Sequence, residues 1–283
     1  MYYLRDLVEN QIDKLHQASN DSWNKRARQA GNGDGKPRLH PSSVAGCTRA
    51  AILTAVHPFP DHPLWVEHTN PFGLYTKSVM LSGQVWELEI SRMLDAEIGE
   101  SFTASTRRWN KYWAWELDAQ IIAPDEKFPL GLIIELKDTA EYNFKIRSRL
   151  PYRHHAVQLS VYQELMGNNT PARLYYNGRG HWAEYDIWHS NGYIYCEGQR
   201  DGHLSENSFE YDVPARMQEL EAWLDSGELP PTEETPFERS FGCVRGSIKK
   251  GYFPNCQWYQ YCWPEMPQEG PFPANAFMNK KSW

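Results

Sequence analysis

An apolar run that ends in charged residues is the feature that most restricts how this chain can fold. Leu132–Ile134 has the composition of a buried strand, and it continues directly into Glu135, Leu136 and Lys137. Side chains two apart in a strand share one face, so Glu135 and Lys137 project together whereas Leu136 points into the core. A carboxylate and an ammonium group are therefore expected side by side at the end of one strand.

A second strand is expected just before this one, and it carries another carboxylate. The aromatic-rich segment 107–123 has strong strand propensity and places Asp118 in its middle, and the turn-rich insert 123–131 follows it. If the two strands pair, Asp118 joins Glu135 and Lys137. When two carboxylates lie this close together, ionising both costs free energy unless a cation lies between them. This favours a divalent metal at this position.

The size and charge of the chain exclude several classes of protein. With 283 residues, 41% of them hydrophobic, the chain can bury a substantial core and lacks the composition of a disordered protein. Its net charge of −7 argues against a broadly basic nucleic-acid binder, because such proteins neutralise phosphates with a largely cationic surface. The chain nevertheless contains local clusters of basic residues. The segment 145–153, beside the charged motif, is equally compatible with phosphate contacts and with a solvated surface.

The chain carries no sign of membrane association. No run of about 18 apolar residues occurs, and the N-terminal segment lacks the apolar core of a signal peptide, so we expect an intracellular, cytoplasmic protein. We expect one elaborated domain over 1–283. Within it, 1–75 form an N-terminal helical region, 76–190 the central core, and 191–283 a C-terminal helix and tail.

Helical patterns flank the two strands. The segment 76–98 has a broad apolar surface at helical spacing and carries Glu87, and another helix is expected to start at Pro151. On that helix Gln158 and Tyr162 lie four apart and therefore share one face. The patterns also predict a helix over 2–30, a helix from Ser42 or Ser43 with Cys47 about one turn inside it, a hairpin around 177–180, and a helix over Val213–Leu224.

Each of these motifs alone is weak, but their order along the chain is specific. Gly83-x-x-x-Glu87 on a helix, Asp118 in a strand, Glu135-x-Lys137 in the next strand and Gln158-x-x-x-Tyr162 on a helix follow one another. This set resembles the PD-(D/E)XK nuclease superfamily, and specifically its RecB-like branch, over roughly residues 38–265. The resemblance implies an α/β, restriction-endonuclease-like fold with a mixed central sheet flanked by helices.

The chemistry of phosphodiester hydrolysis agrees with that resemblance. The reaction needs a nucleophilic water at neutral pH and stabilisation of charge on the phosphate, and Mg²⁺ or Mn²⁺ held by carboxylates supplies both. The expected metal ligands are Glu87, Asp118, Glu135 and the Leu136 carbonyl. Lys137 would orient the attacking water or stabilise the developing negative charge.

Gln158 and Tyr162 have two interpretations. The resemblance implies that they position DNA or a water molecule, whereas a buried tyrosine with a satisfied hydroxyl group is the structural alternative. His155, three residues before Gln158, is equally compatible with a phosphate contact and with a surface position.

Four of the five cysteines form a second set. Cys47 precedes the core, and Cys243, Cys256 and Cys262 follow it, which is similar to a subset of RecB-like nucleases, including the AddB-type and CRISPR-associated ones, that bind a [4Fe–4S] cluster. Twelve residues separate Cys243 from Cys256, whereas the family often places these two close together. Zinc and unligated buried thiols are the alternatives. Cys196 lies in an expected strand and is assigned to the core.

The resemblance implies a divalent-metal-dependent DNA nuclease that hydrolyses phosphodiester bonds, as an exonuclease on single-stranded DNA or on DNA ends. One alternative is a non-catalytic DNA-binding or assembly module that keeps the fold and the cluster, and another is a restriction-type endonuclease. The intact motif residues count against the first alternative. Protein partners would then belong to DNA repair, phage replication or CRISPR adaptation.

Overall fold

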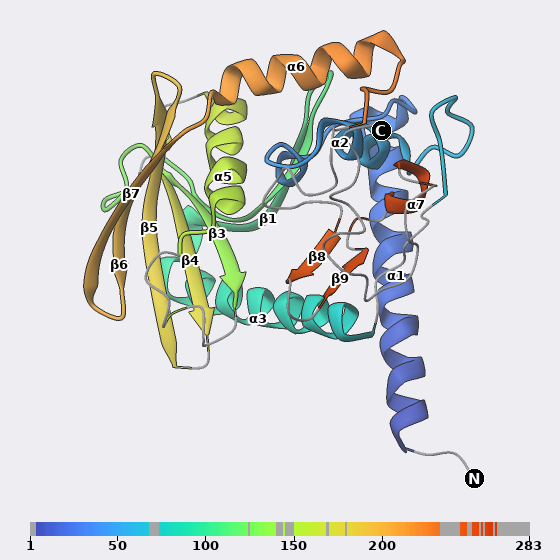
Figure 1. The fold of residues 1–283 in the computed structure, drawn as a ribbon. Coiled ribbons are helices and arrows are strands. Elements are labelled where there is room, and N and C mark those ends of the chain that lie inside the picture. Colours follow the sequence, from blue (N-terminus) through green and yellow to red (C-terminus); the bar gives the residue numbers. More distant parts are fainter. Residues whose placement is uncertain are drawn as a thin grey trace.

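The fold is known from a computed structural model (Figure 1). It describes residues 4–67, 74–123, 125–139, 144, 150–167, 170–178, 180–232, 244–247, 251–254, 256, 258–262 and 264. Cys243 and most of the basic segment 145–153 lie outside these described residues, so the structure does not bear on the roles expected for them.

A seven-stranded mixed sheet forms the centre of the molecule, with its strands in sequence order from β1 to β7. The strands are β1 (Phe102–Trp109), β2 (Ala114–Ile121), β3 (Leu132–Asp138), β4 (Ala172–Gly178), β5 (His181–Ser190), β6 (Tyr193–Arg200) and β7 (His203–Glu210). Neighbouring strands are antiparallel except β3 and β4, which run parallel and are joined by a crossover through a helix. The expected α/β fold with a mixed sheet flanked by helices is confirmed at this level.

Helices lie against both faces of the sheet and beyond its β1 end (Figure 1). They are α1 (Leu4–Gly33), α2 (Thr48–Val56), α3 (Leu74–Ile98), α5 (Arg153–Met166) and α6 (Val213–Ser226). In the tail, β8 (Val244–Ser247) pairs with β9 (Gly251–Pro254), and α7 (Tyr259–Cys262) follows. None of the described helices is long and apolar enough to cross a membrane.

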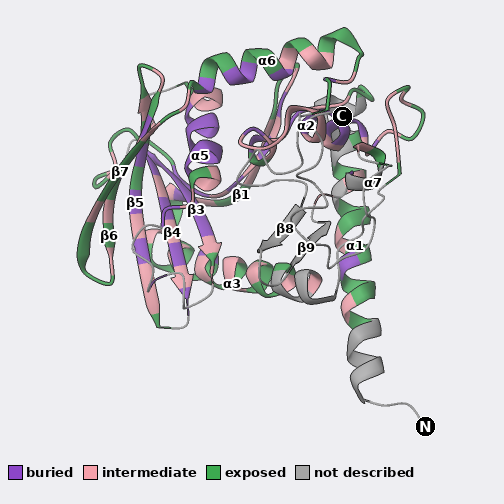
Figure 2. Cartoon of the chain, in the orientation of Figure 1, coloured by how far each residue is buried: buried purple, intermediate pink, exposed green. Residues whose placement is uncertain are grey.

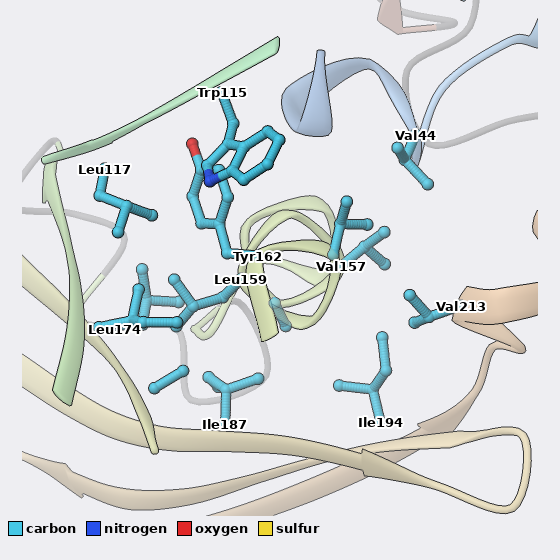
Figure 3. Close-up of a cluster of buried hydrophobic side chains, with 14 of the residues drawn as sticks. Val44, Trp115, Leu117, Val157, Leu159, Tyr162, Leu174, Ile187, Ile194 and Val213 are labelled. Atoms are coloured by element: carbon cyan, nitrogen blue, oxygen red, sulfur yellow. The ribbon is translucent and has the colours of Figure 1, made fainter. Parts of the chain in front are cut away.

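The larger of two hydrophobic clusters surrounds α5. Eight residues of this helix are buried, and Figure 2 shows burial concentrated on α5 and on the strands beside it. In Figure 3, Leu117, Leu174, Ile187 and Ile194 from four different strands lie around the helix. Because α5 is enclosed on most sides, its apolar residues are not restricted to one stripe. The helix ends where Gly167 adopts a left-handed conformation with φ of 102°, which glycine reaches without a steric penalty.

The smaller cluster lies between α3 and the opposite face of the sheet. Ile134 and Leu136 of β3 pack there with Ile90 and Leu94 of α3. Leu136 is therefore buried as expected, on the face opposite to α5. The helices α1, α3 and α6, the β4–β5 hairpin and the buried strand position of Cys196 were all predicted from the sequence and are confirmed.

Two local predictions are wrong. The segment 107–123 is not one strand, because Asn110 forms a turn in which its side-chain oxygen accepts hydrogen bonds from the amides of Tyr112 and Trp113. The segment is divided between β1 and β2. Cys47 is not one turn inside a helix but the N-cap residue of α2, since Pro41–Ser43 forms a separate 3₁₀ turn before it.

Candidate active site

The site begins where β2 and β3 separate. Their ladder pairs Ile121 with Leu132 and ends at Ala119 with Ile134, one residue before Asp118 and Glu135. Beyond that point Asp118 Oδ2 accepts a hydrogen bond of 2.8 Å from the backbone amide of Leu136. A side-chain carboxylate thus takes the place of a ladder partner, which holds Asp118 in the opening between the two strands.

Lys137 brings the two carboxylates together. Its ammonium group donates to Glu135 Oε1 and lies 3.9 Å from Asp118 Oδ2. The predicted convergence of Asp118, Glu135 and Lys137 is therefore confirmed. The ammonium group supplies the positive charge that stands next to the two acids in this structure.

Glu135 is the most buried of the acids, and its two carboxylate oxygens differ in their contacts. Its side chain is 1% exposed, and Oε1 accepts from Lys137 and, at 2.8 Å, from Gln158 Nε2. Glu135 Oε2 is also buried and accepts no hydrogen bond from an N–H group of the described residues; the carboxyls of Glu135 and Asp118 can bond to each other only while one of them is protonated. An unpaired buried carboxylate oxygen is costly, so this oxygen is an unusual feature of the site.

Burial and mutual repulsion make these carboxyl groups hard to ionise. Burial, followed by the negative charge of Asp118, raises the pKa of Glu135 to about 8 and that of Glu87 to about 7. Burial also raises the pKa of Asp118. Burial alone would lower the pKa of Lys137, but Glu135 and Asp118 raise it above its ordinary value, so this side chain stays charged.

Glu87 reaches the site from α3 rather than from the sheet. Its neighbour Trp86 stacks on Tyr175 of β4, with ring centroids 6.1 Å apart, which anchors this part of α3 to the sheet. Across the described part of the chain, no three His, Cys, Asp or Glu side chains are grouped closely enough to hold a metal ion. Asp118 and Glu135 share the Lys137 ammonium group, whereas Glu87 acts on them through its charge.

Gln158 and Tyr162 lie behind Glu135, as the shared helix face predicts. Gln158 Nε2 donates to Glu135 Oε1 and also, at 2.9 Å, to the hydroxyl oxygen of Tyr162. The Tyr162 hydroxyl donates in turn to the carbonyl of Glu116. Both side chains are buried, and Figure 3 shows Tyr162 beside Trp115 in the core. Tyr162 thus has the buried, hydrogen-bonded position of the structural alternative, and Gln158 orients Glu135.

Sequence reasoning missed a set of polar residues around Glu116. This carboxylate accepts from Ser105 Oγ at 2.7 Å and from the Arg107 guanidinium, and Arg26 of α1 lies 3.9 Å away. Glu116 lies two residues before Asp118, so the alternation of a strand was a signal for it. Its contact with α1 depends on tertiary structure.

Ser105 marks a distortion next to Asp118. Its φ of 49° lies in the left-handed region, which is uncommon for a residue other than glycine. The β1–β2 ladder pairs Ala104 with Ala119 and Thr106 with Leu117, but it skips the pair between them, Ser105 with Asp118. Asp118 thus lies at an interruption of the ladders on both sides of β2, and strained positions of this kind cluster at functional sites.

Neutral histidines adjoin the charged residues. Burial lowers the pKa of His40 to about 4 and that of His154 to about 3, and the charge of Lys137 contributes to both shifts. His155 is partly buried, and its Nδ1 lies 2.8 Å from the hydroxyl of Tyr176. Arg153, the described end of the basic segment, donates to a backbone carbonyl of β7.

The cysteine-bearing tail packs against α2. Arg49, two residues after Cys47, lies over the ring of Tyr261, next to Cys262, at 5.3 Å. The ring centroids of His57 and the buried Trp258 are 5.4 Å apart, and Cys256 Sγ accepts from the Trp258 amide. The segments that carry the first and last cysteines of the expected set are therefore in contact, but the three described members, Cys47, Cys256 and Cys262, are not grouped closely enough to hold a metal. Cys196 is separate from them and buried in β6.

Comparison with known proteins adds no relative to this description. A scan against protein-family models and a search of curated proteins both found no match to this chain. The function is therefore inferred from the geometry of the site.

Proposed function

We propose that this chain is a divalent-metal-dependent deoxyribonuclease that hydrolyses phosphodiester bonds. The observation that carries the proposal is the buried Oε2 of Glu135, which accepts from no N–H group of the described residues, beside Asp118 and the charged Lys137. Asp118 and Glu135 would hold Mg²⁺ or Mn²⁺, with the Leu136 carbonyl and, from farther away on α3, Glu87 as further ligands. When bound, such a metal supplies a water of lowered pKa and stabilises charge on the phosphate.

The side chains around the acids have complementary roles. Lys137 is kept charged by its two carboxylate neighbours, so it stabilises negative charge on a phosphate rather than accepting a proton. Gln158 holds the orientation of Glu135 through the bond to Oε1, and Asp118 is fixed by the Leu136 amide. The resemblance to RecB-like nucleases supports an exonuclease that acts on single-stranded DNA or on DNA ends.

Cleavage of labelled DNA tests this function. We expect the purified protein to degrade linear single-stranded DNA in the presence of Mn²⁺ or Mg²⁺, to stop when a chelator is added, and to leave circular single strands intact. Cleavage of circular substrates would instead indicate an endonuclease of the restriction type. Binding of DNA without cleavage under any divalent metal would contradict the proposal and favour a non-catalytic module.

We further propose that Cys47, Cys243, Cys256 and Cys262 hold a [4Fe–4S] cluster. The packing of Tyr261 and Trp258 on α2 supports this, because it brings the segments around Cys47 and Cys262 together. A cluster there would close a loop of about two hundred residues, which restricts the unfolded chain more than the folded one.

The cluster has a measurable consequence. Anaerobically purified protein is expected to contain iron and acid-labile sulfide and to show the broad visible absorbance of a [4Fe–4S] cluster. Cys47→Ser should lose this absorbance and lower the melting temperature, whereas Cys196→Ser, outside the proposed ligand set, should keep the absorbance. Stoichiometric zinc without iron would assign the cysteines to zinc instead.

A further inference from the structure

A hollow on the β5–β7 part of the sheet is separate from the candidate active site. Its volume is about 460 Å³, and Trp188, Tyr195, Glu197, Glu206 and Ser208 are among its lining residues. It lies on the sheet face that α3 covers farther along, over β1, β2 and β3. Trp188 is 38% exposed, so part of its indole ring is accessible from solvent.

Strand register places two unpaired carboxylates opposite each other beside this aromatic pair. Glu197 of β6 is the direct partner of Glu206 of β7, and both side chains are exposed. Like charges directly opposite each other on neighbouring strands are destabilising. Neither carboxylate has a hydrogen bond or an ion pair within the described part of the chain. The sheet therefore carries a local repulsion that a cation would relieve.

The same sheet face shows how it binds a guanidinium group. Arg173 of β4 donates from Nε to Asp186 Oδ1 at 2.8 Å and from Nη2 to Oδ2 at 3.2 Å. Its Nη1 lies 2.7 Å from Glu184 Oε1, so this arginine is held by two carboxylates of β5. Asp186 is in turn the direct strand partner of Glu197. The acidic residues of this face thus extend from β5 to β7. The two acids of β5 hold an arginine, whereas Glu197 of β6 and Glu206 of β7 do not.

The aromatic rings next to these acids suit a planar cation. The rings of Trp188 and Tyr195 are stacked at 10°, with centroids 5.5 Å apart. A guanidinium group stacks on such rings while its N–H groups donate to carboxylates. A nucleic-acid base would also stack on them, but the adjacent Glu197 and Glu206 would repel its phosphates.

We propose that this hollow binds an arginine side chain of a protein partner. The guanidinium lies against Trp188 and Tyr195 and donates to Glu197 and Glu206, in the way that Arg173 is held by its two acids. Because β7 is the last strand of the sheet, an incoming segment reaches Glu206 from the open edge. The arginine site is independent of the proposed nuclease activity. The partner is a protein with a basic segment that docks on this face of the sheet.

Titration with short peptides tests the proposal. The probe is acetyl-Gly-Arg-Gly-amide, and its control is the same peptide with citrulline, which has the shape of arginine without its charge. We expect the arginine peptide to shift the NMR signal of the Trp188 indole N–H, assigned by its loss in Trp188→Phe, and the citrulline peptide to leave it unchanged. Equal shifts with both peptides, or no shift with either, would overturn the proposal.

Charge substitutions identify the acids responsible. Glu197→Gln and Glu206→Gln should each weaken binding of the arginine peptide at least about fivefold, because each removes one charged acceptor. Glu126→Gln, at an exposed position in the insert between β2 and β3, serves as the matched control and should leave binding unchanged. Each hollow variant should also melt no lower than wild type, since it removes the repulsion between opposed carboxylates. Unchanged binding in both hollow variants would contradict the site.

Discussion

Glu135→Gln is expected to lose DNA cleavage by at least about a hundredfold, because it removes the buried negative charge that a divalent metal needs. The substitution keeps the shape of the side chain and the acceptor for Lys137 and Gln158, so the surrounding contacts are retained. Lys137→Ala should show a loss of similar size, since it deletes the charge beside both acids. Initial rates on an end-labelled single strand, with Mn²⁺ in excess, measure both effects.

Two controls separate catalysis from folding. Glu97→Gln changes an exposed carboxylate of α3 and should leave the rate of cleavage unchanged. Circular dichroism and DNA binding should be preserved in Glu135→Gln, because the loss is expected in the chemical step. Wild-type rates of cleavage in both Glu135→Gln and Lys137→Ala would show that this protein cleaves DNA at a different site.

Without divalent metal, Glu87 and Glu135 are expected to make the protein less stable as the pH rises from about 4.5 to about 8. Burial raises the pKa of Glu87 to about 7 and that of Glu135 to about 8, from an ordinary value of 4.5. In this window these two carboxyls bind more protons in the folded protein than in the unfolded chain, so their contribution to the free energy of unfolding falls with increasing pH. His40 and His154, whose pKa values are lowered by burial, contribute in the opposite direction below about pH 6.5, so the carboxyl effect is measured as a difference between variants. Melting temperatures of chelator-treated wild type and Glu135→Gln across this range measure the effect, because the histidine contribution is common to both proteins.

Glu87→Gln isolates one part of this dependence. The neutral amide cannot ionise, so the melting temperature of the variant should increase relative to wild type as the pH rises from about 4.5 to about 7. Glu97→Gln, on the same helix but exposed, is the matched control and should retain the wild-type slope. Equal slopes in Glu87→Gln and wild type would show that Glu87 does not ionise in this range.

Divalent metal should reverse the destabilisation. A cation that binds the ionised acids stabilises the folded state, by about 2.7 kcal/mol when its concentration is a hundred times the dissociation constant. The gain in melting temperature on adding Mn²⁺ should therefore be larger near pH 8 than near pH 5, because protonated carboxyls bind metal poorly. A gain that is the same at both pH values, and that persists in Glu135→Gln, would place metal binding outside this site.

Strand alternation explains why the central part of the site was predictable. The spacing of Glu135, Leu136 and Lys137 determines which side chains share a face, and any strand over these residues gives the same result. The four-residue spacing of Gln158 and Tyr162 on a helix works in the same way. The periodicities of strand and helix are local properties, so they can be read without knowledge of the partners.

The surroundings of the acids depended on contacts between distant segments. The turn at Asn110 creates β1, the β1–β2 register puts Arg107 opposite Glu116, and α1 brings Arg26 to the same carboxylate. The unusual backbone of Ser105 and its position at the gap beside Asp118 also arise from strand pairing. None of these relations has a periodic signature in the chain.

The sequence by itself determined the α/β class, the order of the acidic, Glu-x-Lys and Gln-x-x-x-Tyr motifs, and the face on which each residue lies. Only the tertiary structure decided that Asp118 occupies the opening between β2 and β3, that Tyr162 is buried behind Glu135, and that Glu197 and Glu206 oppose each other. The physical reason is that burial, and with it the pKa of a carboxyl group, depends on which strands and helices pack together. The periodicity of a strand or helix determines which way a side chain points, whereas packing determines whether that side chain is buried and what surrounds it.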